Sequence, residues 1–192
     1  MIIGVINIKG GVGKTTSSLA IATAAQRSGL SVTVVDTDPQ GSATLWAQAA
    51  EDADDPLPFP VVSRNQAEIR RMRERRPDRD GELIVIDTPP NGAVVDEAIK
   101  TADFVVIPTL SSPIDLQQTM LTAAQCQDAG KDYAVLIVMA RKGTNALRAF
   151  RTAVEEYGAG IFDTEIPLRE DFKADFGHTF RSNLNGYEDV WN

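Results

Sequence analysis

Residues 2–16, Ile2-Ile3-Gly4-Val5-Ile6-Asn7-Ile8-Lys9-Gly10-Gly11-Val12-Gly13-Lys14-Thr15-Thr16, decide the fold of this 192-residue chain. An apolar run of strand length leads into a glycine-rich turn, and a helical stretch at 14–28 follows. Glycines let backbone N–H groups turn inward around a phosphate chain, and a helix N-terminus adds partial positive charge. The order of strand, loop and helix therefore predicts a phosphate-binding loop (P-loop).

The side chains of this loop have expected roles. Lys14 can reach the β- and γ-phosphates of a nucleotide, and the Thr15 hydroxyl can ligate Mg²⁺. The remaining residues expected around the nucleotide are Gly10, Gly11, Val12, Gly13 and Thr16. The alternative is a glycine-rich turn without a ligand, which the complete motif and its context make the weaker interpretation.

Acidic residues close two later apolar runs. The run 31–36 ends in Asp36-Thr37-Asp38-Pro39-Gln40-Gly41, and Leu83-Ile84-Val85-Ile86-Asp87 has the pattern of a Walker B strand. Strand C-termini face the ligand crevice in open α/β sheets, so these carboxylates are expected near the phosphates, where they can hold Mg²⁺ or orient the attacking water. Alternatively, they terminate strands and cap helices. The segment 88–92 is predicted to be a switch loop beside the γ-phosphate.

The alternation of apolar and helical stretches predicts the fold class. Five continuous apolar runs are expected strands: 2–8, 31–36, 83–87, 104–108 and 134–139. Helices are expected at 14–28, 41–50, 66–76, 94–101, 114–129 and 144–157, and a surface loop at 51–60. Continuous apolar strands are buried on both faces, which indicates an α/β, doubly wound, mostly parallel sheet flanked by helices. The length fits one domain over residues 1–192.

Composition limits the classes of function. The net charge of −8 argues against a nucleic-acid footprint over the whole surface, so any DNA contact must be local. The single cysteine, Cys126, excludes an internal disulfide and a CxxC metal site within one chain. We see no signal peptide and no apolar run of membrane-spanning length, so we expect a cytoplasmic protein.

Four motifs in order resemble the deviant Walker A, or SIMIBI-type, P-loop ATPases, and most closely the short ParA proteins of plasmid and chromosome partition. They are KGGVGKTT at 9–16, DTDPQG at 36–41, LIVIDTPP at 83–90 and VVIPTLSSPIDL at 105–116. The resemblance covers essentially the whole chain. It implies ATP and Mg²⁺ as cofactors and slow intrinsic ATP hydrolysis.

The resemblance also implies residue roles. Lys9 would reach across a two-fold interface to the partner's phosphates, so that ATP holds a sandwich dimer together. Asp38 would position the attacking water, Asp36 would lie near the metal shell, and Asp87 would hold Mg²⁺ through water. Late segments containing Arg141, Pro167 and Arg169 would hold the base.

The implied function is DNA partition by a cytoplasmic, nucleoid-associated ATPase. Its ATP-bound homodimer would bind non-specific DNA, and a ParB-like centromere-binding adaptor would stimulate hydrolysis. The alternatives are a relative that positions protein cargo, a MinD-like membrane-associated ATPase and a small-molecule ligase. The MinD-like alternative requires a basic amphipathic C-terminal helix, whereas the tail at 181–192 is short and partly acidic, so we expect no membrane binding. A nitrogenase iron protein needs two cluster cysteines per subunit, which one cysteine cannot supply.

Two groups of basic residues are candidates for DNA contact. Seven of the thirteen arginines lie within 64–79, although a solvated helix face is the more common meaning of such a run. The resemblance favours the second group: Arg141, Lys142, Arg148, Arg151, Arg169, Lys173 and Arg181. His178, Trp46 and Trp191 are expected to be structural.

Overall fold

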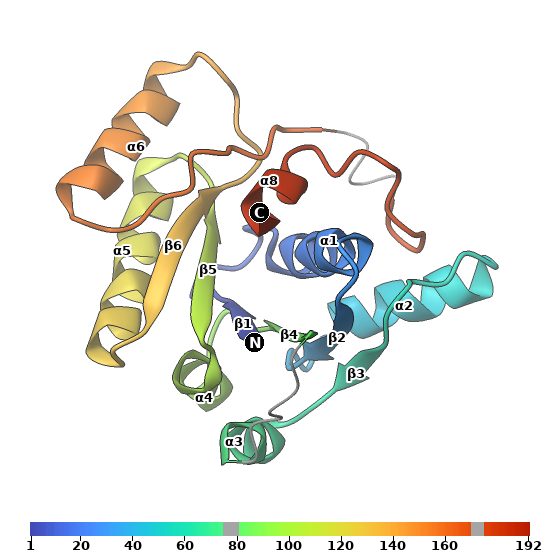
Figure 1. Cartoon of the computed structure of the whole chain (residues 1–192). Helices are drawn as coiled ribbons and strands as arrows, with labels where there is room; N and C mark the ends of the chain where they lie inside the picture. The colour runs from blue at the N-terminus through green and yellow to red at the C-terminus, as the bar shows by residue number, and fades with distance from the viewer. Residues whose placement is uncertain (75–80, 170–174) are drawn as a thin grey trace.

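The computed structural model describes residues 1–74, 81–169 and 175–192 (Figure 1). Among these residues, six parallel strands form one sheet in the order β3-β2-β4-β1-β5-β6. The strands are β1 (Ile2–Val5), β2 (Ser31–Asp36), β3 (Val61–Ser63), β4 (Glu82–Asp87), β5 (Phe104–Thr109) and β6 (Asp132–Ile137). Since β1 lies inside the sheet and the chain winds away from it in both directions, the doubly wound α/β prediction is confirmed.

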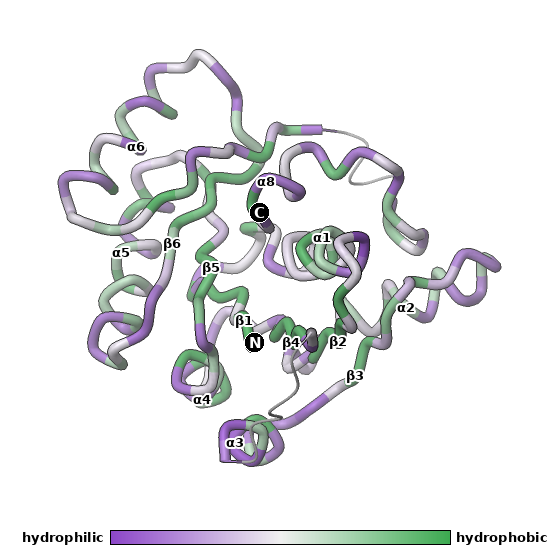
Figure 2. Tube along the Cα trace, in the orientation of Figure 1, coloured by the Kyte–Doolittle hydropathy of each residue, from purple (hydrophilic) through white to green (hydrophobic). Residues whose placement is uncertain are grey.

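Helices cover both faces of this sheet (Figure 1). The first hydrophobic cluster packs α1 (Lys14–Arg27), α2 (Ser42–Asp52) and the C-terminal helix α8 (Tyr187–Trp191) against one face. The second cluster packs α3 (Gln66–Glu74), α4 (Ala93–Thr101) and α5 (Pro113–Asp128) against the other. Beyond β5, α6 (Asn145–Glu156) packs with β6 and α5 in a third cluster. Apolar residues therefore concentrate along the strands, and polar residues on the outer helices (Figure 2).

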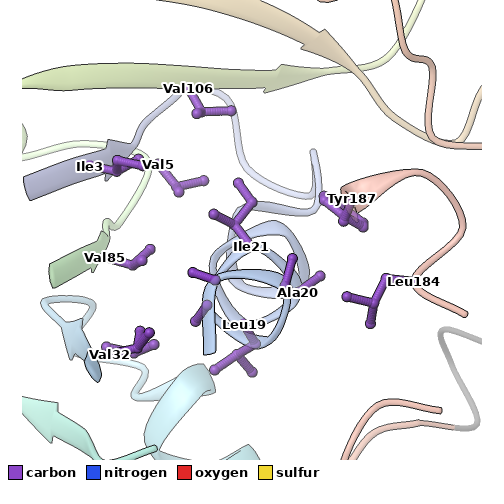
Figure 3. Close-up of a cluster of buried hydrophobic side chains, with 14 of the residues drawn as sticks. Ile3, Val5, Leu19, Ala20, Ile21, Val32, Val85, Val106, Leu184 and Tyr187 are labelled. Carbon is purple, nitrogen blue, oxygen red and sulfur yellow. The ribbon is translucent and has the colours of Figure 1, made fainter. Parts of the chain in front are cut away.

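Helix α1 is enclosed on two sides (Figure 3). Ile3, Val5 and Val85 of the sheet lie on one side of it, and Leu184 and Tyr187 of the C-terminal segment lie on the other. Most of α1 is buried, which fits its composition of small and aliphatic residues around the whole circumference. The helix that follows the P-loop is therefore held between the sheet and the chain's own tail.

All the predicted strands and helices are present, and their described ends lie within three residues of the predicted ones. Strand β1 ends at Val5 rather than Ile8, and beyond it the buried Asn7 side chain donates to Pro108 O at 2.9 Å and accepts from Lys9 N at 2.9 Å. The predicted end of α3 at residue 76 lies outside the described residues. Among the described helices, none combines the length and apolar character needed to cross a bilayer.

Within residues 1–74, 81–169 and 175–192, two short elements were not predicted. Strand β3 adds three residues at the edge of the sheet, and α8 adds five residues near the C-terminus. The predicted surface loop at 51–60 was partly wrong, because α2 continues to Asp52 and Phe59 is buried in the core. Such short elements depend on packing more than on local propensity, which is why their sequence signal is weak.

Candidate functional site

The P-loop joins the end of β1 to the start of α1. Gly11 and Gly13 both have φ of 74°, in the left-handed region that favours glycine. Val12 is fully buried and anchors the loop from within. Lys14 is also buried, and its Nζ donates to Lys9 O at 2.9 Å. Burial lowers the pKa of Lys14, although the charges of Asp87 and Asp38 oppose this shift.

Asp87 lies at the end of β4 and contacts α1 through two hydroxyl groups. Thr15 Oγ1 donates to one carboxylate oxygen at 2.8 Å, and Ser18 Oγ donates to the other at 3.0 Å. Burial raises the pKa of Asp87 to about 7, and the charge of Asp36 adds to this effect. The two hydrogen bonds and the charge of Lys14 act in the opposite direction. The carboxylate is thus poised to ionise near neutral pH.

Asp36 is the register partner of Asp87 on β2. Its Oδ1 accepts from Asp38 N at 3.1 Å, and its Oδ2 accepts from both the backbone N and the hydroxyl of Thr44 at 2.9 and 2.8 Å. The carboxylate therefore fixes the turn after β2 and the start of α2. Together with Thr15 and Asp87 it presents hard oxygen donors, the type that Mg²⁺ prefers alongside phosphate oxygens.

A cleft of about 590 Å³ opens above the P-loop. Lys14, Thr15, Asp38 and Thr88 line it with polar groups, and Gly10, Gly11, Gly13 and Thr16 contribute the loop itself. Asp38 is half-buried, and its Oδ1 accepts from Gln40 N at 2.9 Å. The size is typical of a site for a nucleotide-sized ligand. The structure thus places the predicted loop residues other than Val12 around one space, together with Asp38 and with Thr88 of the predicted switch loop, whereas Asp36 and Asp87 do not line it.

A smaller, mainly apolar cavity of about 130 Å³ adjoins this cleft. It shares Gly13, Thr16 and Met139 with the cleft and is otherwise lined by Val138, Ile166, Pro167, Leu168, Arg169 and Tyr187. A flat base would fit here while the phosphates lie on the P-loop. Pro167 and Arg169 were predicted at this position, whereas Arg141 is not among the described lining residues, and its carbonyl accepts from Thr144 Oγ1 at 3.0 Å.

Met139, Phe176 and Tyr187 are among the lining residues that the sequence analysis did not assign to the site. Met139 has φ of 51°, a conformation uncommon for a residue with a side chain and often found at functional sites. Phe176 is 54% exposed, and its ring lies 5.4 Å from that of Trp46 in a tilted arrangement at the rim of the cleft. No local pattern marks these residues, because distant segments bring them to the site.

Lys9 lies at the start of the P-loop, and its ammonium group pairs with the carboxylate of Asp115 on α5. The Asp115 side chain is 2% exposed, and Ser112 Oγ also donates to it. In the single chain, the residue predicted to act across a dimer interface is therefore bound within its own subunit.

The two groups of basic residues that are candidates for DNA contact differ in how many of their members form ion pairs with carboxylates. Among the described arginines of 64–74, Arg64 pairs with Glu68, and Arg70 and Arg73 both pair with the buried Glu97, while Arg75, Arg76 and Arg79 lie outside the described residues. In the second group, Arg151 pairs with Glu165, Arg181 lies 3.5 Å from Asp175, and Lys173 is outside the described residues. Arg141 and Lys142 are exposed just before α6, and Arg148 is exposed on α6 itself.

His178 and both tryptophans make structural contacts. His178 Nδ1 lies 3.4 Å from Asp55, and its carbonyl accepts from Trp46 Nε1 at 3.0 Å. Trp191 Nε1 donates to Ser28 Oγ at 3.0 Å. These bonds hold the C-terminal segment against α2 and α1.

Comparison with known proteins finds relatives that cover most of this chain. One relative, Maintenance of carboxysome distribution protein A from Halothiobacillus neapolitanus, is 30% identical over 179 residues, covering 89% of this chain and 81% of the relative. Protein ParA from Rhizobium radiobacter is 26% identical over 193 residues, covering 96% and 85%. The solved structure of cobyrinic acid a,c-diamide synthase from Mycobacterium smegmatis, with bound ADP and magnesium, has a TM-score of 0.71 at 19% identity, covering 92% of this chain and 90% of that one.

A family-level match covers nearly the whole chain. Residues 3–179 match the CobQ/CobB/MinD/ParA nucleotide binding domain, which spans the P-loop, both acidic strand ends and the residues that line the smaller cavity except Tyr187. The chain therefore belongs to the CobQ/CobB/MinD/ParA nucleotide-binding family.

Proposed function

We propose that this chain is a Mg²⁺-dependent ATPase of the ParA type that positions a cargo by switching between an ATP-bound dimer on DNA and a released monomer. The observation that carries this proposal is the convergence of Lys14, Thr15 and Asp38 on one cleft, with Asp87 hydrogen-bonded to Thr15 behind it. This arrangement supplies phosphate binding, metal binding and water orientation in one place.

Each residue has one step in the proposed hydrolysis. The P-loop backbone and Lys14 would bind the phosphates, and Thr15, Asp36 and Asp87 are the residues that would hold Mg²⁺. Bound Mg²⁺ would neutralise charge on the β- and γ-phosphates. Asp38 orients the attacking water, and the 88–92 loop changes conformation when the γ-phosphate leaves. Pro167 and Arg169 hold the base, and the exposed Arg141, which does not line the cavity, is assigned to the DNA surface instead.

The dimer is proposed to form through the nucleotide. Lys9 of each subunit would reach the partner's phosphates, adding a second cation where charge develops during transfer. A ligand bound at the interface stabilises the dimer by mass action. The exposed cations Arg141, Lys142 and Arg148 would then contact DNA phosphates, and an adaptor would stimulate hydrolysis.

Two cargoes are supported by different observations. The relative named ParA favours DNA partition with a ParB-like adaptor. The protein would then act in the cytoplasm, associated with the nucleoid. The relative that maintains carboxysome distribution is more similar in sequence and favours a protein assembly as cargo. The membrane-associated alternative has less support, because Leu184 and Tyr187 of the C-terminal segment are buried against α1.

The test combines ATP hydrolysis with mass by light scattering, in the presence and absence of non-specific duplex DNA. Asp38→Ala should lower turnover at least about 100-fold and leave a stable ATP-bound dimer on DNA. Lys9→Ala should abolish dimer-dependent turnover. Asp52→Ala and Lys100→Ala are matched controls, because both side chains are exposed at the ends of helices.

A monomer that hydrolyses ATP regardless of DNA and of Lys9 would refute the switch and support a small-molecule enzyme. Liposome sedimentation with ATP distinguishes the MinD-like alternative, for which binding to anionic vesicles is required.

A further inference from the structure

The Lys9–Asp115 pair has a feature that the proposed hydrolysis does not use. Asp115 is 2% exposed and Lys9 is 29% exposed, so the carboxylate is the deeply buried partner. Lys9 Nζ donates to Asp115 Oδ1, and Ser112 Oγ donates to Oδ2. Burial opposes ionisation of Asp115, but these hydrogen bonds and the charge of Lys9 hold its pKa below the usual value. The pair is therefore a charged contact inside one subunit.

The backbone on both sides of this pair is firmly held. Lys9 N donates to Asn7 Oδ1 at 2.9 Å, and Ile8 N donates to Thr122 Oγ1 of α5 at 3.3 Å. On the other side, Thr119 Oγ1 donates to Asp115 O at 2.8 Å, and the N-cap Ser112 accepts from Asp115 N at 3.3 Å. Only the long Lys9 side chain is free to change partners while the P-loop and α5 keep their positions.

A lysine cannot neutralise a buried carboxylate in its own subunit and also reach a nucleotide in another. Removing one partner of a buried ion pair leaves the other charge desolvated and uncompensated, which is strongly unfavourable. Transfer of Lys9 to a partner subunit must therefore overcome the contact with Asp115.

We propose that Asp115 is a positioning residue that competes with the partner subunit's nucleotide for Lys9, and thereby sets how tightly the ATP-bound dimer forms. This inference rests on the proposed function, since it requires a dimer in which Lys9 acts across the interface. It assigns to the buried Asp of the 105–116 motif a role in keeping the nucleotide-free chain monomeric.

The substitution Asp115→Asn tests it, because asparagine keeps the shape and can still accept from Ser112 but loses the charge that binds Lys9. With a non-hydrolysable ATP analogue and Mg²⁺, sedimentation should show the dimer dissociation constant falling by about tenfold relative to wild type. Asp128→Asn, an exposed position at the end of the same helix, is the control and should leave it unchanged. In a Lys9→Ala background, Asp115→Asn should have no effect, because it acts through Lys9. The proposal would be overturned if Asp115→Asn left the dimer unchanged or weaker. It would also be overturned if the dissociation constant fell equally in the Lys9→Ala background.

A second measurement does not depend on dimerisation. In the nucleotide-free wild type, acetylation of Lys9 followed by mass spectrometry should be several-fold slower than acetylation of the exposed Lys100, and Asp115→Asn should remove most of this protection. Equal reactivity of the two lysines in wild type would overturn the inference even if the variant failed to fold. A wild-type chain that shows the protection but never dimerises with ATP would instead overturn the proposed function and, with it, the competition for Lys9.

Discussion

Without nucleotide, the Asp87→Asn variant should become more stable than wild type as the pH rises, because wild type loses stability and the variant does not. Burial raises the pKa of this carboxyl from 3.8 to about 7 in the folded state. The folded chain therefore binds a proton that the unfolded chain has released, and stability falls as pH rises through this range. A shift of about three units corresponds to at most about 4 kcal/mol, of which about 2 to 3 kcal/mol is lost between about pH 5 and about pH 8.

Asparagine resembles the protonated carboxyl and can keep hydrogen bonds to Thr15 and Ser18, so it should not incur this loss. The assay is urea unfolding of wild type and Asp87→Asn at several pH values without nucleotide. The difference in unfolding free energy should grow in favour of the variant by about 2 to 3 kcal/mol from about pH 5 to about pH 8. Adding Mg²⁺ and ATP should raise the unfolding free energy of the variant less than that of wild type, because the variant lacks the anionic oxygen that would hold the metal. A difference in unfolding free energy that stays constant with pH would refute the raised pKa of the buried Asp87 carboxyl.

Two further predictions concern the tail and the surface. Tyr187→Phe removes the 2.8 Å hydrogen bond to the buried Ser17 hydroxyl and should lower the free energy of unfolding by about 1 kcal/mol, measured in urea with the exposed Tyr157→Phe as control. Replacing both Arg141 and Lys142 by glutamate should weaken binding to duplex DNA for all sequences and reduce the slope of log affinity against log salt by about 2; an unchanged slope would remove these residues from the DNA surface.

The core of the candidate site could be predicted from the sequence because its chemistry is local. The P-loop needs glycines at the two positions with positive φ and a lysine and threonine at the start of the helix, all within a few residues. The acidic ends of β2 and β4 were also predictable, since strand ends in a parallel sheet meet at one edge. Burial of these strands on both faces explains why their apolar runs indicated the fold class.

Only the tertiary structure decided which distant groups meet. Lys9 and Asp115 are 106 residues apart, and Ser17 and Tyr187 are 170 apart, so no local pattern connects them. The cavity beside Thr16 likewise depends on how β6 and the segment after it lie against the P-loop, which the sheet order determines. Helix α8 is too short to be stable alone and forms because Tyr187 is buried on α1. The sequence alone determined the local chemistry of the P-loop and the strand ends, whereas chain topology and burial decided how Lys9 is held and where the cavity beside Thr16 lies.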